Sequence, residues 1–318
     1  MPYTRRRFFQ STGALAAGLT AAAYPASSQA PSRGGRGQAP NPIDSVLDSA
    51  IKMPMVRFGK AEISRLIVGC NTLYGYAHFN NTLGTVMKEW FTSAKVSELL
   101  LNCNKYGVNT FNYFHPGRGQ SDYERFVAEG GKMQLIAQGN VDPEILAKTV
   151  KPLAIYHHGE NTDNAYRSGK LEIVKDYCKK TRQQGVLVGV GSHMPEVLAK
   201  VEDEGWDVDF YAGCVYNRRR TPEELRKLLG GELLEMPDEV YLQDDPPRMY
   251  KFMRQTKKPC FAFKILAAGR VRSPEEAFKL AFQSIKPTDC VFVGMFPRIK
   301  DEVKEDAWWT TRHGVVAS

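Results

Sequence analysis

From residue 60 onward, short apolar segments alternate with segments of helical period, and this alternation constrains the fold more than any other feature of the chain. The apolar segments lie at 64–71, 109–114, 133–138, 153–158, 186–192, 208–217, 259–267 and 289–296. Each is apolar nearly throughout, as parallel strands that are covered on both faces require. Eight such segments, each followed by a helical one, predict an α/β fold with a single (β/α)8 barrel.

The helical segments show apolar residues at helical spacing, with Pro or Ser at several starts and Gly at several ends. They lie at 93–107, 121–131, 142–150, 171–185, 195–205, 221–231, 246–258, 273–285 and 299–306. A doubly wound open sheet is the alternative architecture, because it uses the same alternation. No G-x-G-x-x-G motif follows the first apolar segment, so a Rossmann dinucleotide site has no support.

The first 42 residues resemble an export signal followed by a linker. The segment TRRRFFQSTGALAAGLTAAAYPA starts with basic residues and continues into an Ala-rich stretch, 14–23, that is too short to span a bilayer. Arg5 to Phe9 resemble the start of a twin-arginine signal, which implies export by the twin-arginine translocation machinery to the periplasm or the cell exterior. We therefore predict a signal peptide at 1–30, a Pro/Gly-rich linker at 31–42 and the barrel at 43–318.

The resemblance to an export signal also predicts where the chain is cleaved and whether it stays anchored to the membrane. Cleavage is expected after Ala23 or after Ser28, because both sites leave small residues at the positions that are recognised. No cysteine follows the apolar stretch, so a lipid anchor is not expected, and the stretch itself makes no stable membrane anchor.

The charge pattern and the cysteine spacing argue against nucleic acid binding, a disulfide framework and a zinc ribbon. The formal net charge is +8, but the basic residues form no stripe of the kind that a nucleic acid partner requires. The run Arg218–Arg220 is interpreted as a solvated loop. The six cysteines are scattered without C-x-x-C spacing, so we expect neither a disulfide framework nor a zinc ribbon.

Polar side chains gather where the predicted strands end, which is where a (β/α)8 barrel carries its active site. The strand at 153–158 ends in His157 and His158, and Glu160 follows. Because side chains alternate along a strand, only one of the two histidines can point into the barrel mouth. The residues at the other strand ends are Asn71, Asn112, His115, Gln138, Ser192, His193, Asn217 and Lys264.

These residue types suggest acid–base chemistry on a small polar molecule. His157, His158 and His115 are candidate catalytic residues, because a neutral imidazole is a general base near neutral pH. Lys264 is a fourth candidate: if it is buried, its pKa falls and it becomes a base or a Schiff-base amine, whereas otherwise it reaches out to the rim. The amides and hydroxyl suit a substrate with many hydroxyl groups, such as a sugar, and the candidate substrate-binding residues are Asn71, Asn112, Gln138, Ser192 and Asn217.

Metal-assisted chemistry is the second version of this hypothesis. His115, His158, Glu160 and His193 are side chains of the kind that bind zinc or manganese. Three protein ligands and an open position would suit a catalytic ion that acidifies water or polarises a carbonyl.

Seven segments in chain order resemble motifs of the aldo-keto reductases, over almost the whole of the predicted mature region. ISRLIVGCNTL resembles that family's first strand, GVNTFNYF its G-[IV]-N-x-F-D-T-A, and LAIYHHG its L-D-L-Y-x-x-H. VGVGSHMPEVL resembles I-G-V-S-N-H, VYN resembles EYN, and FAFKILAAGR resembles x-A-Y-S-P-L-G-x-G. VFVGMFPRIKDEVKED resembles the cofactor segment. The resemblance implies the barrel and, in the family, an NADP-dependent reduction of carbonyl groups.

The family's catalytic Asp, Tyr, Lys and His are only partly matched. The Asp position is Asn112, the Tyr position is Gly117, the Lys position is Gln138, and the His is retained as His157. An amide cannot supply the charge, and Gly cannot donate the proton.

The cofactor positions are matched in part as well. Gly191 and Ser192 stand where the family binds the nicotinamide carboxamide. The resemblance implies Phe263 as the aromatic that stacks on nicotinamide, and it places Gly294 in the cofactor segment.

Three hypotheses follow from the sequence. The first is an exported enzyme that acts on a small polar, sugar-like substrate through histidine-centred acid–base or metal-assisted chemistry. The second is an NADP-dependent oxidoreductase in which Tyr113 or His115 replaces the lost proton donor. The third is a non-catalytic binding protein that has kept the barrel and lost the chemistry.

Overall fold

The computed structural model describes residues 42–218, 220–231 and 239–315. The predicted signal peptide, both cleavage sites and the linker up to residue 41 lie outside these ranges. In the described part of the chain, every helix is too short or too polar to span a lipid bilayer.

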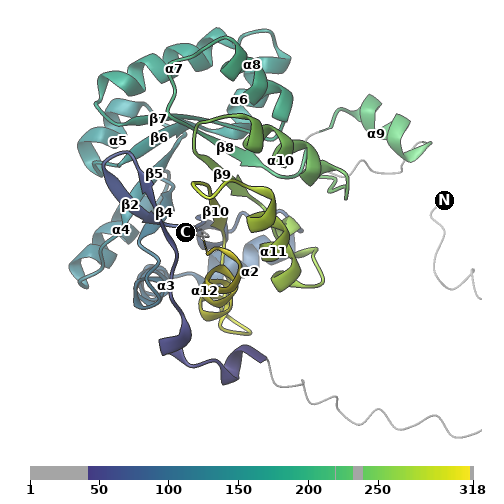
Figure 1. The fold of residues 1–318 in the computed structure, drawn as a ribbon. Helices are drawn as coiled ribbons and strands as arrows, with labels where there is room; N and C mark the ends of the chain where they lie inside the picture. Colours follow the sequence, from purple (N-terminus) through teal and green to yellow (C-terminus); the bar gives the residue numbers. More distant parts are fainter. Residues whose placement is uncertain (1–41, 219, 232–238, 316–318) are drawn as a thin grey trace, which may run out of the picture. The chain divides into compact units, whose positions relative to one another are not determined.

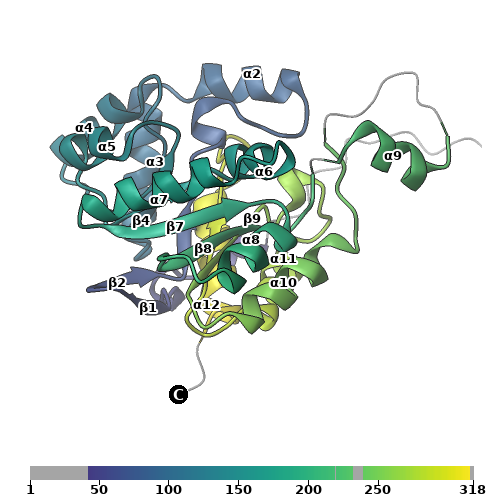
Figure 2. The ribbon, with the colours of Figure 1, turned by 90° about the horizontal axis from the view of Figure 1, so that it is seen from above.

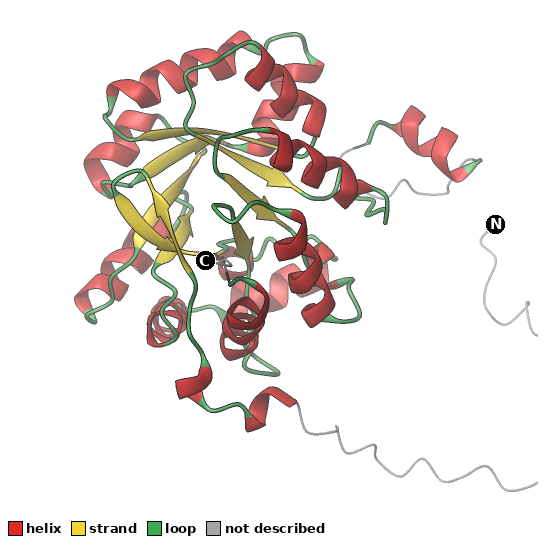
Figure 3. Ribbon diagram, in the orientation of Figure 1, coloured by secondary structure: helices red, strands yellow, loops and turns green. Residues whose placement is uncertain are grey.

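Eight parallel strands close into a barrel, which the helices surround (Figure 3). The strands are β3 (Leu66–Val68), β4 (Thr110–Tyr113), β5 (Gln134–Gly139), β6 (Ala154–His157), β7 (Leu187–Ser192), β8 (Phe210–Cys214), β9 (Cys260–Phe263) and β10 (Cys290–Val293). The barrel is closed because β10 pairs with both β9 and β3. Each strand coincides with a predicted apolar segment, β5 ending one residue beyond it, so the predicted (β/α)8 barrel is confirmed and the open-sheet alternative is wrong.

The predicted helices lie around the barrel with small changes at their ends, except for α9, which stands away from it (Figure 1). They are α3 (Ser93–Lys105), α4 (Gly119–Ala128), α5 (Pro143–Thr149), α7 (Glu172–Gln183), α8 (Pro195–Asp203), α9 (Pro222–Leu229), α10 (Asp245–Gln255), α11 (Pro274–Ser284) and α12 (Glu302–His313). The last helix starts later than the segment 299–306, because Asp301 caps it by accepting from the N–H of Lys304, and it runs seven residues further.

The apolar core has two layers, one between the strands and the helices and one inside the barrel. The continuous apolar character of the strands follows from this, since both faces of each strand are covered. Tyr156, Phe210, Phe261 and Phe292 belong to the inner layer. All six cysteines are buried and unpaired, as expected without a disulfide framework.

A short hairpin that the repeats do not reveal closes one end of the barrel. Its strands are β1 (Met55–Phe58) and β2 (Ala61–Ser64), which pair in antiparallel fashion. The ring of Phe58 packs edge-on against Phe210 and Phe261, with centroids 5.2 and 5.0 Å away. Figure 2 shows this hairpin and helix α2 (Asn81–Trp90) at opposite ends of the barrel. The end away from the hairpin is therefore the open mouth.

Candidate active site

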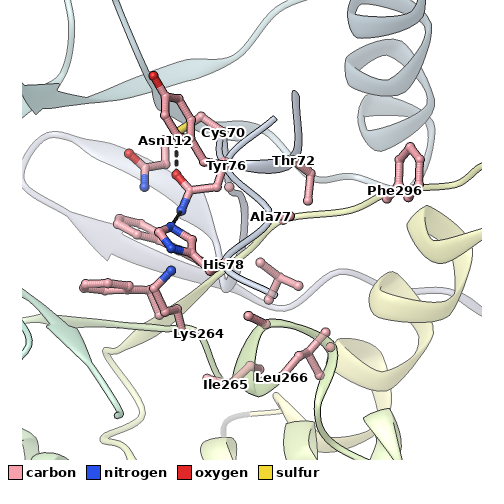
Figure 4. Close-up of a pocket in the computed structure, with 18 of the residues that line it drawn as sticks. Cys70, Thr72, Tyr76, Ala77, His78, Asn112, Lys264, Ile265, Leu266 and Phe296 are labelled. Atoms are coloured by element: carbon pink, nitrogen blue, oxygen red, sulfur yellow. Dashed lines mark hydrogen bonds between the residues drawn. The ribbon is translucent and has the colours of Figure 1, made fainter. Parts of the chain in front are cut away.

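A cavity of about 810 Å³ opens at the carboxyl ends of the barrel strands. Its walls combine polar residues at the strand ends with apolar residues from the loops above them. Nine residues singled out from the sequence line it: Asn71, Asn112, Gln138, His158, Glu160, His193, Phe263, Lys264 and Gly294. Figure 4 shows Asn112, His78 and Lys264 toward one side of the cavity, and Leu266 and Phe296 toward the other.

His157 and His158 point in different directions, as strand alternation requires. His158 lines the cavity, whereas His157 lies outside the barrel in a smaller hollow between β6 and α7. There His157 Nδ1 lies 2.7 Å from the hydroxyl of Thr162, and its ring packs edge-on against Tyr177. The structure therefore places His157, the one position at which the sequence matched a catalytic residue of the reductases, outside the cavity and does not support a catalytic role for it.

His115 and Tyr113 also face away from the cavity. Nδ1 of His115 lies 3.0 Å from the Tyr113 hydroxyl, and Tyr113 packs against Tyr123 of α4. Neither side chain is among the cavity's lining residues. The structure therefore does not support His115 as a catalytic residue or ligand, or either residue as a replacement proton donor.

Ser192, which is buried, and Asn217, which is partly exposed, do not line the cavity. Ser192 is fully buried, and its hydroxyl donates to Asp163. The side-chain oxygen of Asn217 is buried and has no hydrogen-bond partner among the described residues. Ser192 thus acts on the site through Asp163. The structure does not support direct contact of Ser192 or Asn217 with a substrate.

Lys264 lies directly after β9, at the point where the chain leaves the barrel. Its backbone has φ of 63°, a left-handed conformation that is costly for a residue with a side chain and is often found at functional sites. The side chain is partly exposed, toward the cavity that it lines. Burial, and then the charge of Arg218, lower its pKa to about 8. The described residues provide no hydrogen bond or ion pair to its amine.

His193 is held by a carboxylate from a helix that the apolar pattern does not predict. Asp163 belongs to α6 (Gly159–Arg167) and lies 2.7 Å from Nδ1 of His193. The backbone N–H of His193 and the Ser192 hydroxyl also donate to Asp163. A Cβ at Gly159 would lie 3.3 Å from Cε1 of His193, so this glycine lets the helix approach the ring. Asp163 therefore fixes the tautomer with the proton on Nδ1, which leaves the lone pair on Nε2.

The electrostatics of this pair keep the imidazole neutral, with the carboxylate beside it. Burial, and then the charges of Arg218 and Lys264, hold the pKa of His193 well below its ordinary value, so the ring is neutral at pH 7. Burial raises the pKa of Asp163 to about 6, against the hydrogen bonds from Ser192 and the His193 backbone. A neutral imidazole oriented by a carboxylate is a competent general base.

A buried ionic network beside Lys264 was not predicted from the sequence. Arg218 is 3% exposed rather than solvated, and it pairs with Glu239 and lies 3.6 Å from Glu160. Glu239 also lies 2.6 Å from Nδ1 of His78 and accepts from the Tyr241 hydroxyl. Burial opposes its ionisation, but the hydrogen bond from His78 and the charge of Arg218 keep the pKa of Glu239 low. The network joins the loop after β3 to the segment before α10.

Amide side chains complete the polar wall. Asn71 lies 3.0 Å from Nε2 of His78, and Gln138 donates to the sulfur of Cys70 at 2.8 Å. Tyr156 donates to Asn112 across the barrel interior at 3.2 Å. These contacts fix the three amides, and each lines the cavity with groups able to bind hydroxyls.

The predicted metal ligands are not brought together. His158, Glu160 and His193 line the cavity, but His115 does not. Among the described residues, no group of three or more His, Cys, Asp or Glu side chains is arranged to hold a metal ion. The side chains present therefore do not fit a resident zinc or manganese.

The residues at the predicted cofactor segment do not fit NADP either. Phe263 and Gly294 line the cavity, but so do the carboxyls of Glu302, Glu305 and Asp306 from the same segment. Lys300 and Arg272 line the cavity too, but Lys300 is already paired with Glu305. The phosphates of a dinucleotide would therefore face mainly acidic groups at this segment.

Comparisons with known proteins give a likeness of fold. No protein-family model and no curated protein matches the chain. The solved structures that it resembles include a truncated 3-deoxy-D-arabino-heptulosonate 7-phosphate synthase from Thermotoga maritima, 12% identical, with a TM-score of 0.48 over 82% of this chain and 92% of that one. A thermostable aldo-keto reductase is 11% identical, with a TM-score of 0.39 over 84% of this chain and 96% of that one.

Proposed function

We propose that this protein is an enzyme that acts on the carbonyl group of a small, polar, sugar-like molecule. Lys264 supplies the amine and His193, oriented by Asp163, moves the proton. The observation that carries the proposal is the amine of Lys264, which faces the cavity without a partner among the described residues and lies in the same wall as His193. Such an amine is in part uncharged at neutral pH and is nucleophilic.

The chemistry needs neither an oxidant nor a reductant. The neutral Lys264 amine attacks the carbonyl carbon, two protons move from nitrogen to oxygen, and water leaves as the C=N bond of an imine forms. The imine takes up a proton on nitrogen, and this cation acidifies the neighbouring C–H bond. Nε2 of His193 takes the proton from that carbon, and the electron pair moves into the C–N unit to give a neutral enamine. Asn71, Asn112 and Gln138 would bind the hydroxyl groups of the substrate.

Chemical labelling with a small aldehyde tests the amine directly. We expect glycolaldehyde with sodium cyanoborohydride, which reduces the imine to a stable secondary amine, to label Lys264 before the other lysines. Labelling should reach half its maximum near pH 8, the pKa to which burial lowers Lys264. Peptide mass spectrometry reads out the site, and exposed Lys257 serves as the internal control. Labelling of Lys264 no faster than of Lys257 contradicts the proposal.

We further propose that the protein acts outside the cytoplasm, because Arg5 to Phe9 resemble a twin-arginine signal. A precursor with Arg5→Lys and Arg6→Lys should stay in the cytoplasm, since the receptor reads the guanidinium pair. Fractionation and immunoblotting measure this, with Arg36→Lys in the predicted linker as the matched control. Normal export of the double variant rules out this route.

A further inference from the structure

A second charged region lies at the end of the cavity formed by the turn after β10 and the first turns of α12. Glu302, Glu305 and Asp306 line the cavity there, together with Lys300. Glu302 accepts from the backbone N–H of Phe296 at 2.6 Å, and Glu305 pairs with Lys300. Two of the three carboxyls therefore have partners within the protein.

Asp306 has no such partner. It is 2% exposed, and no described residue gives its carboxyl a hydrogen bond or an ion pair. Burial, and then the charges of Glu302 and Glu305, raise its pKa well above the ordinary value, and only Lys300 opposes them. Buried polar groups are normally satisfied, because leaving one without a partner costs free energy. Since this carboxyl faces the cavity, a ligand group is the partner that it lacks.

The chemistry of this region narrows the choice of ligand group. A metal ion does not fit, because the described His, Cys, Asp and Glu side chains form no group able to hold one. A phosphate fits poorly, because Lys300 is already paired with Glu305 and the remaining carboxyls would repel a second anion in a buried site. An ammonium group fits, since it donates charge-assisted hydrogen bonds to carboxylates.

We infer that the end of the cavity formed by Glu302, Glu305 and Asp306 binds an ammonium group of the ligand and excludes dinucleotide phosphates. The inference deepens the proposed function, on which it rests, by narrowing the substrate to an amino-bearing polyol or sugar. In this arrangement Lys264 and His193 take the carbonyl end of the ligand and Asp306 takes the amino end.

Two probes that differ in one substituent test the inference. N-methyl-D-glucamine and sorbitol share a polyol chain, but only the first carries an ammonium group, and neither has a carbonyl that reacts with Lys264. By calorimetry at pH 7, we expect N-methyl-D-glucamine to bind at least about tenfold more tightly than sorbitol. Asp306→Asn, which keeps the shape of the side chain, should remove most of that preference, and Asp306→Ser provides a second variant.

Several outcomes would overturn the inference: equal affinity for the two probes, a preference that survives both substitutions at Asp306, or NADPH binding in the micromolar range. The same titrations in a Lys264→Met background separate this inference from the proposed function. A preference for the ammonium probe in that background, in a protein whose Lys264 shows no special reactivity toward aldehydes, supports the binding site and contradicts the proposed chemistry.

Discussion

Replacing Lys264 by methionine is expected to stabilise the protein at pH 7 by up to about 3 kcal/mol. The pKa of Lys264 falls from the ordinary 10.5 to about 8 because burial penalises the charged amine. Each pKa unit corresponds to about 1.4 kcal/mol between the two protonation states. Methionine has a similar length and no charge, so it removes the penalty while it fills the same space. A gain in stability on removing a functional group is typical of active sites.

The pH dependence of the stability difference between Lys264→Met and the wild type is a second test of its sign. The folded pKa lies below the unfolded one, so the penalty is fully present below pH 8 and is relieved as the pH rises from about 8 to 10.5. The advantage of Lys264→Met over the wild type should therefore shrink through that window. Urea unfolding at several pH values measures it, with Lys257→Met at an exposed position as the control. A Lys264→Met protein that is less stable than the wild type at pH 7 contradicts the description of the amine as poorly solvated and without a partner.

The second large effect is expected at the His193–Asp163 pair. His193→Ala should lower proton transfer from carbon by about 10²–10⁴-fold, the usual contribution of a positioned general base. Asp163→Asn should act in the same direction, because an amide can donate to Nδ1 and would then favour the tautomer with the proton on Nε2. His157→Ala is the matched control, since that imidazole lies outside the barrel beside Tyr177. Equal losses in the His157 and His193 variants would mean that the histidine effect is structural.

The barrel could be predicted because its signal is local and repeated. Each strand is covered on both faces and is therefore a continuous apolar run, which the sequence displays eight times. The hairpin β1–β2 lacks such a signal, because each of its strands carries an exposed charged residue, Arg57 or Glu62, and so is not a continuous apolar run. Helix α6 was missed for a related reason: the segment GENTDNAYR contains few apolar residues, so it shows no helical period.

The sequence predicted only those site residues whose positions follow directly from the ends of the strands. The positions of Asn71, Asn112, Gln138, His193 and Lys264 follow from the strand ends, and all five line one cavity. Alternation showed that one of two adjacent histidines points inward, but not which one.

The partners of the site residues come from loops and from distant parts of the chain. Asp163 comes from the unpredicted helix, and Glu239 lies 21 residues beyond Arg218, with no pattern to indicate their contact. Arg218 is buried because it makes that contact. The sequence gives no sign of the contact, so the basic run alone predicts a solvated loop.

Hydrogen exchange at the carbon next to a carbonyl tests the joint action of Lys264 and His193 most directly. A set of small sugars and amino sugars, including dihydroxyacetone, glyceraldehyde and glucosamine, is incubated with the protein in D2O and followed by NMR. Imine formation at Lys264 and proton removal by His193 predict exchange above the protein-free rate for at least one compound, its loss in Lys264→Met, and its retention in His157→Ala. Exchange that is absent for every compound, or that persists unchanged in Lys264→Met, would contradict the proposed chemistry.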